Sequence, residues 1–342
     1  MKVLYDHAHP FFLAHGGLQT EIEQTKAALE KLGVEVEFLR WWDERQRGDL
    51  IYFFGFASND YLLHARDIKL PVVMTPLFTE TCNRSDTRLR CQGLLVRMIL
   101  ALPFGEGVKQ QLTWRTYHNC THNIVRLEAE RRVLQMVYRV PSGKISVIPS
   151  GLSGAYLQAG HGPRNEPHLI CTGTITQRKN FVELAEMAHR AQVPILFTGK
   201  PYQPNDPYWI RFRKLIDGRW VKHHLVPYES PAGGEMEMIK LLQAARGFVF
   251  MSDHENWCLS AHEAAACGLP LLVQDQKWSR ERFGDQARYF TSIGVTAQNV
   301  EILKRFYADA PGLPAPAVKL YSWDDTALGL KRVYERVLST SR

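Results

Sequence analysis

The sequence predicts an α/β protein made of two doubly wound domains that face each other across a cleft. Strand and helix patterns alternate in both halves of the 342 residues. Most strand segments are short runs that are apolar throughout, which is typical of parallel strands covered on both faces. The chain is also longer than the ~100–200 residues of one domain, and the polar segment 159–167, rich in Gly and Pro, is the expected linker.

The first domain is expected over residues 1–160. Its first strand is predicted in 2–7, and the helix that follows has apolar residues at helical spacing and ends at Gly33. Further strands are predicted at 34–39, 49–56, 70–78 and 144–152. Because ligands bind beyond the carboxyl ends of the strands in such sheets, the loops after the strands are expected to carry function.

The second domain is expected over residues 161–320, followed by a terminal helix over 321–342. The alternation of elements restarts after the linker. Strands are predicted at 168–175, 193–199, 248–252 and 269–275, and helices at 180–191, 238–247 and 260–268. The same type of sheet is therefore expected in both halves of the chain.

Positive charge is concentrated in the first domain. The chain carries a net charge of +7, and the segment 84–144 holds eleven Lys and Arg against four Asp and Glu. This excess is compatible with a solvated helix face beside a buried one. A more specific interpretation is a surface for an anionic partner, either lipid headgroups or a phosphorylated acceptor. No nucleic acid is expected as partner, because no binding motif is present.

Localisation in the cytoplasm is expected, with peripheral attachment to the inner face of a membrane if segment 84–144 binds lipid. No run of 18 or more apolar residues is present, and the N-terminus lacks the apolar stretch of a signal peptide. None of the six cysteines has the spacing of a zinc site, so free thiols are expected.

Two loops have the composition of anion sites. Gly16 and Gly17 stand directly before a predicted helix, where backbone N–H groups can approach an anion, although a plain flexible turn has the same composition. Arg178 and Lys179 precede a helix that Asn180 and Glu183 are predicted to open as a capping pair. The helix dipole disfavours cations there, so we expect either a bound diphosphate or two solvated charges.

A third loop, SDHENWCLSAHEAAACGLP (252–270), carries two glutamates eight residues apart. Ser260 and Glu263 match a capping box, so Glu263 has a purely structural interpretation. That interpretation does not account for Glu255. The backbone amides of 256–259 precede the predicted helix and are expected to face an anion.

This third loop resembles the E-x7-E signature of retaining glycosyltransferases of the GT-B fold, family 4. Other segments follow in that family's order. They are GGLQTEIEQTKAALEKLGVEV (16–36), ISVIPSGL (145–152), GTITQRKN (173–180) and YSWDDTALGLKRVYERVL (321–338). The resemblance implies two Rossmann-like domains and transfer of a hexose from a nucleoside diphosphate sugar with retention of configuration. The acceptor would be a glycan, a lipid-linked sugar or a small molecule.

The resemblance also implies residue roles. Glu263 would hold the ribose hydroxyls of the nucleotide, and Glu255 would face the hydroxyls of the donor sugar. The amides of Cys258 and Leu259 would cradle the diphosphate, and Lys179 would neutralise it. No metal and no cofactor are implied, because basic side chains and amides take over the role of a metal ion.

The sequence departs from the family pattern at three places. Thr174 replaces the arginine after glycine and is expected among the substrate-binding residues, and Arg178 is expected to take over the contact of that arginine. Residues 75–77 (Thr-Pro-Leu) replace a histidine motif, and 256–258 (Asn-Trp-Cys) replace Gly-Phe-Gly, which predicts an altered sugar pocket. A catalytically impaired nucleotide-sugar-binding protein therefore stays open as an alternative. A phosphorylase or epimerase of the same fold is less favoured.

Overall fold

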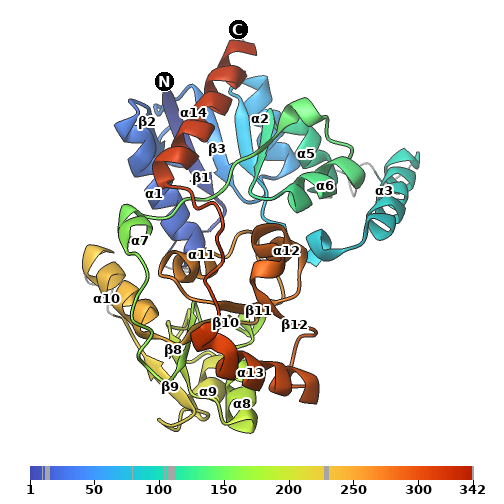
Figure 1. Cartoon of the computed structure of the whole chain (residues 1–342). Helices are drawn as coiled ribbons and strands as arrows, with labels where there is room; N and C mark the ends of the chain where they lie inside the picture. Colours follow the sequence, from blue (N-terminus) through green and yellow to red (C-terminus); the bar gives the residue numbers. More distant parts are fainter. Residues whose placement is uncertain are drawn as a thin grey trace. The chain divides into compact units, whose positions relative to one another are not determined.

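The computed structural model describes residues 1–9, 11, 16–78, 80–103, 105, 109, 113–226 and 231–340, without the side chains of 231–233. Contacts divide the chain into two compact units. Unit 1 comprises Met1–Phe11, Gln19–Gly151 and Trp323–Arg342, and unit 2 comprises Phe12–Leu18 and Leu152–Ser322. Each unit contains a six-stranded sheet in which all neighbouring strands are parallel (Figure 1).

The sheet of unit 1 has the strand order β2-β1-β3-β4-β5-β6. Its strands are β1 (Lys2–His7), β2 (Glu35–Phe38), β3 (Leu50–Phe54), β4 (Val72–Thr75), β5 (His122–Val125) and β6 (Ile145–Val147). Its helices are α1 (Gly17–Lys31, of which Gly17 and Leu18 group with unit 2), α2 (Asn59–Asp67), α3 (Asp86–Ala101), α5 (Thr116–Asn119), α6 (Glu128–Met136) and α14 (Trp323–Thr340). All predicted strands of this half are present, and β5 is an additional one.

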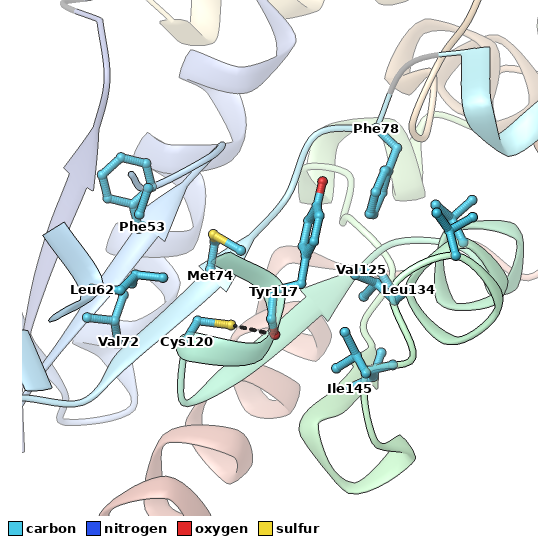
Figure 2. Packing of buried hydrophobic residues seen from close by; sticks show 14 of the residues in the cluster. Phe53, Leu62, Val72, Met74, Phe78, Tyr117, Cys120, Val125, Leu134 and Ile145 are labelled. Atoms are coloured by element: carbon cyan, nitrogen blue, oxygen red, sulfur yellow. Dashed lines mark hydrogen bonds between the residues drawn. The ribbon is translucent and has the colours of Figure 1, made fainter. Parts of the chain in front are cut away.

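One face of this sheet packs on an apolar core. The alternation of side chains along each strand directs Phe53 of β3 and Met74 of β4 to the same face, where they meet Leu62 of α2 and Leu134 of α6 (Figure 2). Tyr117 of α5 joins this cluster and stacks on Phe78, with ring centroids 5.7 Å apart. Helices α2, α5 and α6 are thus fixed on the sheet by burial of large side chains.

The opposite face holds buried tyrosines and one buried ion pair. Tyr52 of β3 lies between Tyr5 of β1, at a centroid distance of 5.4 Å, and Tyr334 of α14, at 5.6 Å. Burial raises the pKa of all three phenols. Arg126 pairs with Glu21 of α1, and both are buried. The terminal helix is therefore part of the interior of unit 1.

The sheet of unit 2 has the strand order β12-β11-β10-β7-β8-β9. Its strands are β7 (Leu169–Thr172), β8 (Ile195–Thr198), β9 (Val221–His224), β10 (Gly247–Phe250), β11 (Leu271–Gln274) and β12 (Arg288–Phe290). Its helices are α7 (Gly154–Gln158), α8 (Phe181–Ala191), α9 (Pro207–Arg213), α10 (Pro231–Ala244), α11 (Leu259–Ala266), α12 (Lys277–Phe283) and α13 (Ala297–Asp309). The four predicted strands are present, and β9 and β12 are additional.

The strand orders define one topological switch point in each unit. In unit 2 the chain runs from β7 to β8 on one side and later returns to β10 on the other side of β7. In unit 1 the strand β1 likewise lies between β2 and β3. Loops that leave two such neighbouring strands in opposite directions open a crevice at their carboxyl ends, where ligands of open α/β sheets bind.

Candidate functional site

The loops after β7 and β10, which flank the switch point of unit 2, are joined by a network of hydrogen bonds. The backbone N–H of Asp253 donates to the carbonyl of Arg178 at 2.9 Å, and the Asn180 amide donates to Asp253 Oδ1 at 2.5 Å. Arg178 Nη1 donates to Ser252 Oγ at 3.2 Å. Arg178 therefore lies between the two loops and holds the second loop in place.

Glu255 is the anionic partner of Arg178. Its Oε1 accepts from Arg178 Nη1 at 2.8 Å and from Ser252 Oγ at 2.9 Å, and its side chain is 13% exposed. Burial alone would raise the pKa of Glu255, but the charges of Arg178 and Lys179 and these hydrogen bonds hold it below its usual value. Glu255 is therefore an ionised carboxylate in a fixed position.

Lys179 has a different environment. Its Nζ lies 5.6 Å from the centre of the Phe250 ring and against Gly173, where an added Cβ would lie 2.9 Å from the nitrogen. Gly173 has a φ of +148°, a backbone conformation that favours glycine. No carboxylate of the described residues lies within ion-pair distance of Lys179. A cation is thus held at the end of β7 without an anionic partner from the described chain.

Helix α11 begins differently from the prediction. Its N-cap is Cys258, in a left-handed conformation with φ 61° and ψ 71°, and Ser260 is already the second helical residue. The predicted capping box of Ser260 and Glu263 is therefore wrong. Glu263 is the fifth residue of the helix, not part of its first turn, and its carboxylate accepts no hydrogen bond from any described residue.

Burial raises the pKa of Glu263 to about 7, the charge of Glu235 adds to the shift, and Lys179 opposes it. Glu263 in α11 thus differs in its ionisation from Glu255, which lies in the loop just before this helix. Glu255 is ionised and paired, whereas Glu263 is half-buried without a donor. A ligand that brings hydroxyl or N–H donors would satisfy this carboxylate.

The start of α11 also presents free backbone donors. The Cys258 carbonyl accepts from the N–H groups of Ala261 and His262, at 3.1 Å and 3.4 Å. Among the described residues, no acceptor pairs with the N–H groups of Leu259 and Ser260. Unpaired donors at the N-terminus of a helix attract anions.

The Gly-Gly loop lies near this helix start. Residues 16–18 belong to unit 2. A Cβ on Gly17 would lie 3.7 Å from Leu259, and a Cβ on Gly16, which has a φ of +137°, would lie 3.1 Å from Thr174 Oγ1. The structure thus brings Gly16 and Gly17 beside two other residues that were predicted to bind substrate.

The predicted capping pair of Asn180 and Glu183 is wrong. A 3₁₀ turn over Gln177–Lys179 leads into Asn180, which has the left-handed angles φ 52° and ψ 38° and makes no side-chain cap. This conformation directs the Asn180 amide to Asp253 on the neighbouring loop. Glu183 accepts from the Tyr208 hydroxyl at 2.7 Å instead. Hydrogen bonds to residues distant in the sequence thus take the place of the predicted capping hydrogen bonds.

A stack of side chains next to the loop after β10 was not predicted from the sequence. The Trp257 and His262 rings are parallel, with centroids 4.5 Å apart, and the Arg282 guanidinium lies 4.4 Å over Trp257. His262 Nδ1 donates to the Cys258 carbonyl at 3.0 Å, and its Nε2 accepts from Arg282 Nε at 3.1 Å. Burial lowers the pKa of His262 to about 3, in agreement with this neutral tautomer. Trp257 is therefore part of the interior of unit 2, where it fixes the turn into α11.

Two histidines of unit 1 do not lie at the carboxyl edge of its sheet. His122 is the first residue of β5 and pairs with Ser146 Oγ at 2.9 Å, so it lies at the opposite edge. His118 pairs with the Tyr138 carbonyl. At the end of β4 the Thr75 hydroxyl bonds to that of Tyr52 at 2.6 Å. None of these residues replaces the missing histidine motif.

Known proteins resemble this chain in sequence and in structure. No protein-family model matches the sequence. The chain is 26% identical over 172 residues to the O-antigen chain mannosyltransferase B of Escherichia coli. This match covers 46% of the chain and 43% of the relative, so less than half of that relative's length is matched.

Solved structures match over nearly the whole chain. Sucrose-phosphate synthase from Thermosynechococcus elongatus has a TM-score of 0.67 at 16% identity and covers 99% of both chains. HepE from Anabaena, solved with UDP and glucose, has a TM-score of 0.59 at 14% identity, over 99% of this chain and 98% of HepE. WaaG, a glycosyltransferase involved in lipopolysaccharide biosynthesis, has a TM-score of 0.59 at 13% identity, over 100% and 98%. These likenesses show that the fold is the GT-B fold, and the predicted fold class is confirmed.

Proposed function

We propose that this protein is a retaining glycosyltransferase that transfers a hexose from a nucleoside diphosphate sugar to an acceptor. The observation that carries the proposal is the set of groups at the ends of β7 and β10. Within the described part of the chain, the Lys179 cation has no carboxylate partner and two amides of α11 are unpaired, and they stand beside one ionised carboxylate and one with a raised pKa. The partial match to a mannosyltransferase and the likeness to HepE, solved with UDP and glucose, support the proposal.

The diphosphate is assigned to Lys179 and the first amides of α11. Lys179 supplies a full positive charge, and the N–H groups of Leu259 and Ser260 supply two oriented donors. Arg178 uses Nη1 to hold Glu255, and its other guanidinium N–H groups make no hydrogen bond to described residues. These basic groups and amides take the role that a metal ion plays in other phosphate sites.

The two carboxylates are assigned to the two ends of the donor. Glu263, which lacks a donor of its own, accepts the ribose hydroxyls. Glu255, fixed by Arg178 and Ser252, accepts hydroxyls of the transferred sugar. The differing pKa shifts fit these roles, because a paired carboxylate stays charged at all working pH values, whereas Glu263 becomes a better acceptor as it loses its proton.

Catalysis on this arrangement depends on position and charge. The bond between the anomeric carbon and the diphosphate oxygen breaks, the oxygen of the acceptor hydroxyl forms the new bond on the same face of the sugar, and the hydroxyl proton passes to the departing diphosphate oxygen. Lys179 and the α11 amides stabilise the negative charge that develops on the departing diphosphate. Holding donor and acceptor in one geometry supplies the rest of the acceleration.

We also propose that the acceptor is lipid-linked and that α3 docks on an anionic membrane surface. Leu94, Leu95 and Met98 of α3 are 53%, 56% and 60% exposed. Exposed arginines at 88 and 90 precede them in α3, whereas two other basic residues of the segment 84–144, Lys109 and Arg126, are buried. The surface for an anionic partner is therefore smaller than the segment predicted from the sequence. No described helix is long and apolar enough to cross a bilayer.

A nucleotide-sugar-binding protein without turnover is the second candidate. It is favoured by the absence of a histidine where the family has one, since Thr75 ends β4 and Pro76 and Leu77 follow it. Both candidates predict that the intact protein binds a nucleoside diphosphate, but only the enzyme hydrolyses the donor slowly in the absence of acceptor.

The test combines a thermal-shift screen and a hydrolysis assay on the intact chain. UDP, GDP and ADP and their hexose conjugates are screened, and a ligand at 100 times its dissociation constant stabilises a protein by about 2.7 kcal/mol. The conjugate that gives the largest shift is then incubated with the protein. Release of free sugar and nucleoside diphosphate identifies the enzyme. Binding without release identifies the second candidate, and the absence of any thermal shift rules out both.

A further inference from the structure

The peptide unit between Cys258 and Leu259 connects the candidate site to the interior of unit 2. It is a planar trans peptide, so its C=O and N–H groups point in opposite directions. The Leu259 N–H has no acceptor among the described residues, whereas the Cys258 carbonyl accepts from His262 Nδ1 at 3.0 Å. The helical N–H groups of Ala261 and His262 reach the same carbonyl at 3.1 Å and 3.4 Å. The contacts that fix the direction of this carbonyl therefore also fix the direction of the free Leu259 N–H.

This peptide unit needs support from its surroundings, because Cys258 has the left-handed angles φ 61° and ψ 71°. Glycine, which the family pattern has at this position, adopts such angles without a steric penalty, but a residue with a Cβ does not. The side chain of Cys258 contributes only a contact of its Sγ with Ser260 Oγ at 3.6 Å. A backbone conformation of this kind persists only where neighbouring groups hold it.

Arg282 determines which nitrogen of His262 carries the proton. A guanidinium group only donates hydrogen bonds, and Arg282 Nε lies 3.1 Å from His262 Nε2. His262 Nε2 must therefore accept, and the proton of the neutral ring lies on Nδ1, which faces the Cys258 carbonyl. Burial and the charge of Arg282 lower the pKa of His262 to about 3, so the ring is neutral at physiological pH.

Both side chains of this Arg282–His262 pair are held by further contacts. The Trp257 indole is parallel to the His262 ring within 4°, and the Arg282 guanidinium lies 4.4 Å from the centre of the same indole. Arg282 Nη2 also donates to the Lys319 carbonyl at 2.9 Å. The Phe283 ring lies 5.2 Å from that of His262. Neither member of the pair can turn away without losing several of these contacts.

We propose that Arg282 and His262 are positioning residues that direct the Leu259 N–H towards the diphosphate of the donor. His262 is 1% exposed, so it acts on the ligand through the peptide unit and not by contact. Its hydrogen bond holds the carbonyl end of the peptide and also polarises it, which makes the N–H at the other end a stronger donor to an anion. This inference rests on the proposed function and adds two residues to the machinery of that site.

Two variants of His262 separate its hydrogen bond from its packing. His262→Phe keeps an aromatic ring against Trp257 but has no donor for the Cys258 carbonyl. His262→Asn loses the ring but keeps an amide N–H close to the position of Nδ1. The nucleotide among UDP, GDP and ADP that gives the largest thermal shift is titrated calorimetrically into each intact protein.

We expect His262→Phe to weaken nucleotide binding at least fivefold and His262→Asn to bind within twofold of the wild type. A role in packing alone predicts the reverse order, because phenylalanine preserves the stack and asparagine does not. Wild-type affinity in His262→Phe, or a greater loss in His262→Asn than in His262→Phe, would overturn the proposal.

Two variants of Arg282 test the other member of the pair. Arg282→Met removes the donor that faces His262 Nε2, and we expect at least a fivefold loss of nucleotide affinity. Arg282→Lys retains a cationic donor and should bind the nucleotide more tightly than Arg282→Met. Wild-type affinity in Arg282→Met would contradict the role of Arg282.

Nuclear magnetic resonance of the ¹⁵N-labelled wild type tests the pair without any substitution. Long-range ¹H–¹⁵N correlations of the His262 ring should show the proton on Nδ1, and addition of the nucleotide should shift the Leu259 amide resonance. A proton on Nε2, or a Leu259 amide resonance that saturating nucleotide leaves unchanged, would overturn the proposal even if the variants did not fold.

Failure of this inference is distinguishable from failure of the proposed function. If the wild type binds none of UDP, GDP and ADP, the proposed function is overturned, and this inference with it. If the wild type binds a nucleotide and His262→Phe binds it equally well, only the positioning role is overturned.

Discussion

Replacement of Glu263 by glutamine separates the ligand-binding role of this residue from its effect on stability. Burial and the charge of Glu235 raise the pKa of Glu263 from 4.5 to about 7. Between these two pH values the folded chain holds a proton on Glu263 that the unfolded chain has lost. The stability contributed by this residue is therefore complete below pH 4.5 and is lost as the pH rises towards 7.

The magnitude follows from the size of the shift. Each pKa unit corresponds to 1.36 kcal/mol, so a shift from 4.5 to about 7 makes the wild type at most about 3 kcal/mol less stable above pH 7 than below pH 4.5. Glu263→Gln has no such dependence. The variant should gain about 2–3 kcal/mol of unfolding free energy over the wild type between pH 5 and pH 8.

Urea unfolding of both proteins at pH 5, 6, 7 and 8 measures this difference. Glu235→Gln is the control, because loss of that charge should lower the pKa of Glu263 and flatten part of the dependence. Nucleotide affinity should fall about tenfold in Glu263→Gln, since a hydrogen bond to a charged partner contributes ~1.5–3 kcal/mol. If the difference in unfolding free energy between the wild type and Glu263→Gln does not change with pH, the burial of Glu263 is refuted. If the nucleotide affinity of Glu263→Gln is unchanged, the ribose contact is refuted.

Three further variants test separate parts of the proposals. Lys179→Ala should weaken nucleoside diphosphate binding at least tenfold by calorimetry with an unchanged melting temperature, and unchanged affinity would exclude a diphosphate contact. Glu255→Gln keeps its hydrogen-bond geometry, so free nucleotide affinity should be equal or higher while turnover falls at least tenfold; wild-type turnover would count against a sugar contact. Leu95→Ser combined with Met98→Ser should abolish sedimentation with anionic liposomes, whereas Leu328→Ser, an exposed leucine on α14, should not. Equal binding of both variants would remove the membrane proposal.

Much of the fold is predictable because several inner strands are almost wholly apolar, as in β3 (Leu50–Phe54) and β10 (Gly247–Phe250), and because β2 (Glu35–Phe38) alternates between polar and apolar residues. The strands that sequence analysis missed have polar residues. β9 (Val221–His224) and β12 (Arg288–Phe290) are edge strands, which are covered less completely than inner ones. β5 is an inner strand, but it begins with His122 and Asn123, whose polar groups bond to Ser146 and to the Tyr117 carbonyl. Such partners lie far away in the sequence and leave no local pattern.

The sequence indicates which residues to consider for the candidate site more clearly than it indicates the contacts that those residues make. The spacing of Glu255 and Glu263 and the position of Lys179 after a strand are local features of the sequence. The hydrogen bonds that determine the ionisation of these side chains are not local, because Arg178 bonds to Glu255, more than 70 residues further along the chain. Neither capping motif considered for α8 and α11 is formed, because each helix begins at a residue in the left-handed conformation, Asn180 or Cys258, that makes no side-chain cap.

The terminal helix α14 has a consequence for the order of folding. Tyr334 packs against Tyr52 in the interior of unit 1, so the native packing of β1 and β3 requires residues that are synthesised about 280 residues later. Most of unit 2 is a continuous segment, Leu152–Ser322, and it is complete before α14 emerges. During synthesis the second unit can therefore reach its native contacts first, while the sheet of the first unit waits with one face only partly covered. A ribosome stalled after residue 322 would hold a chain whose later half is folded and whose earlier half is still open.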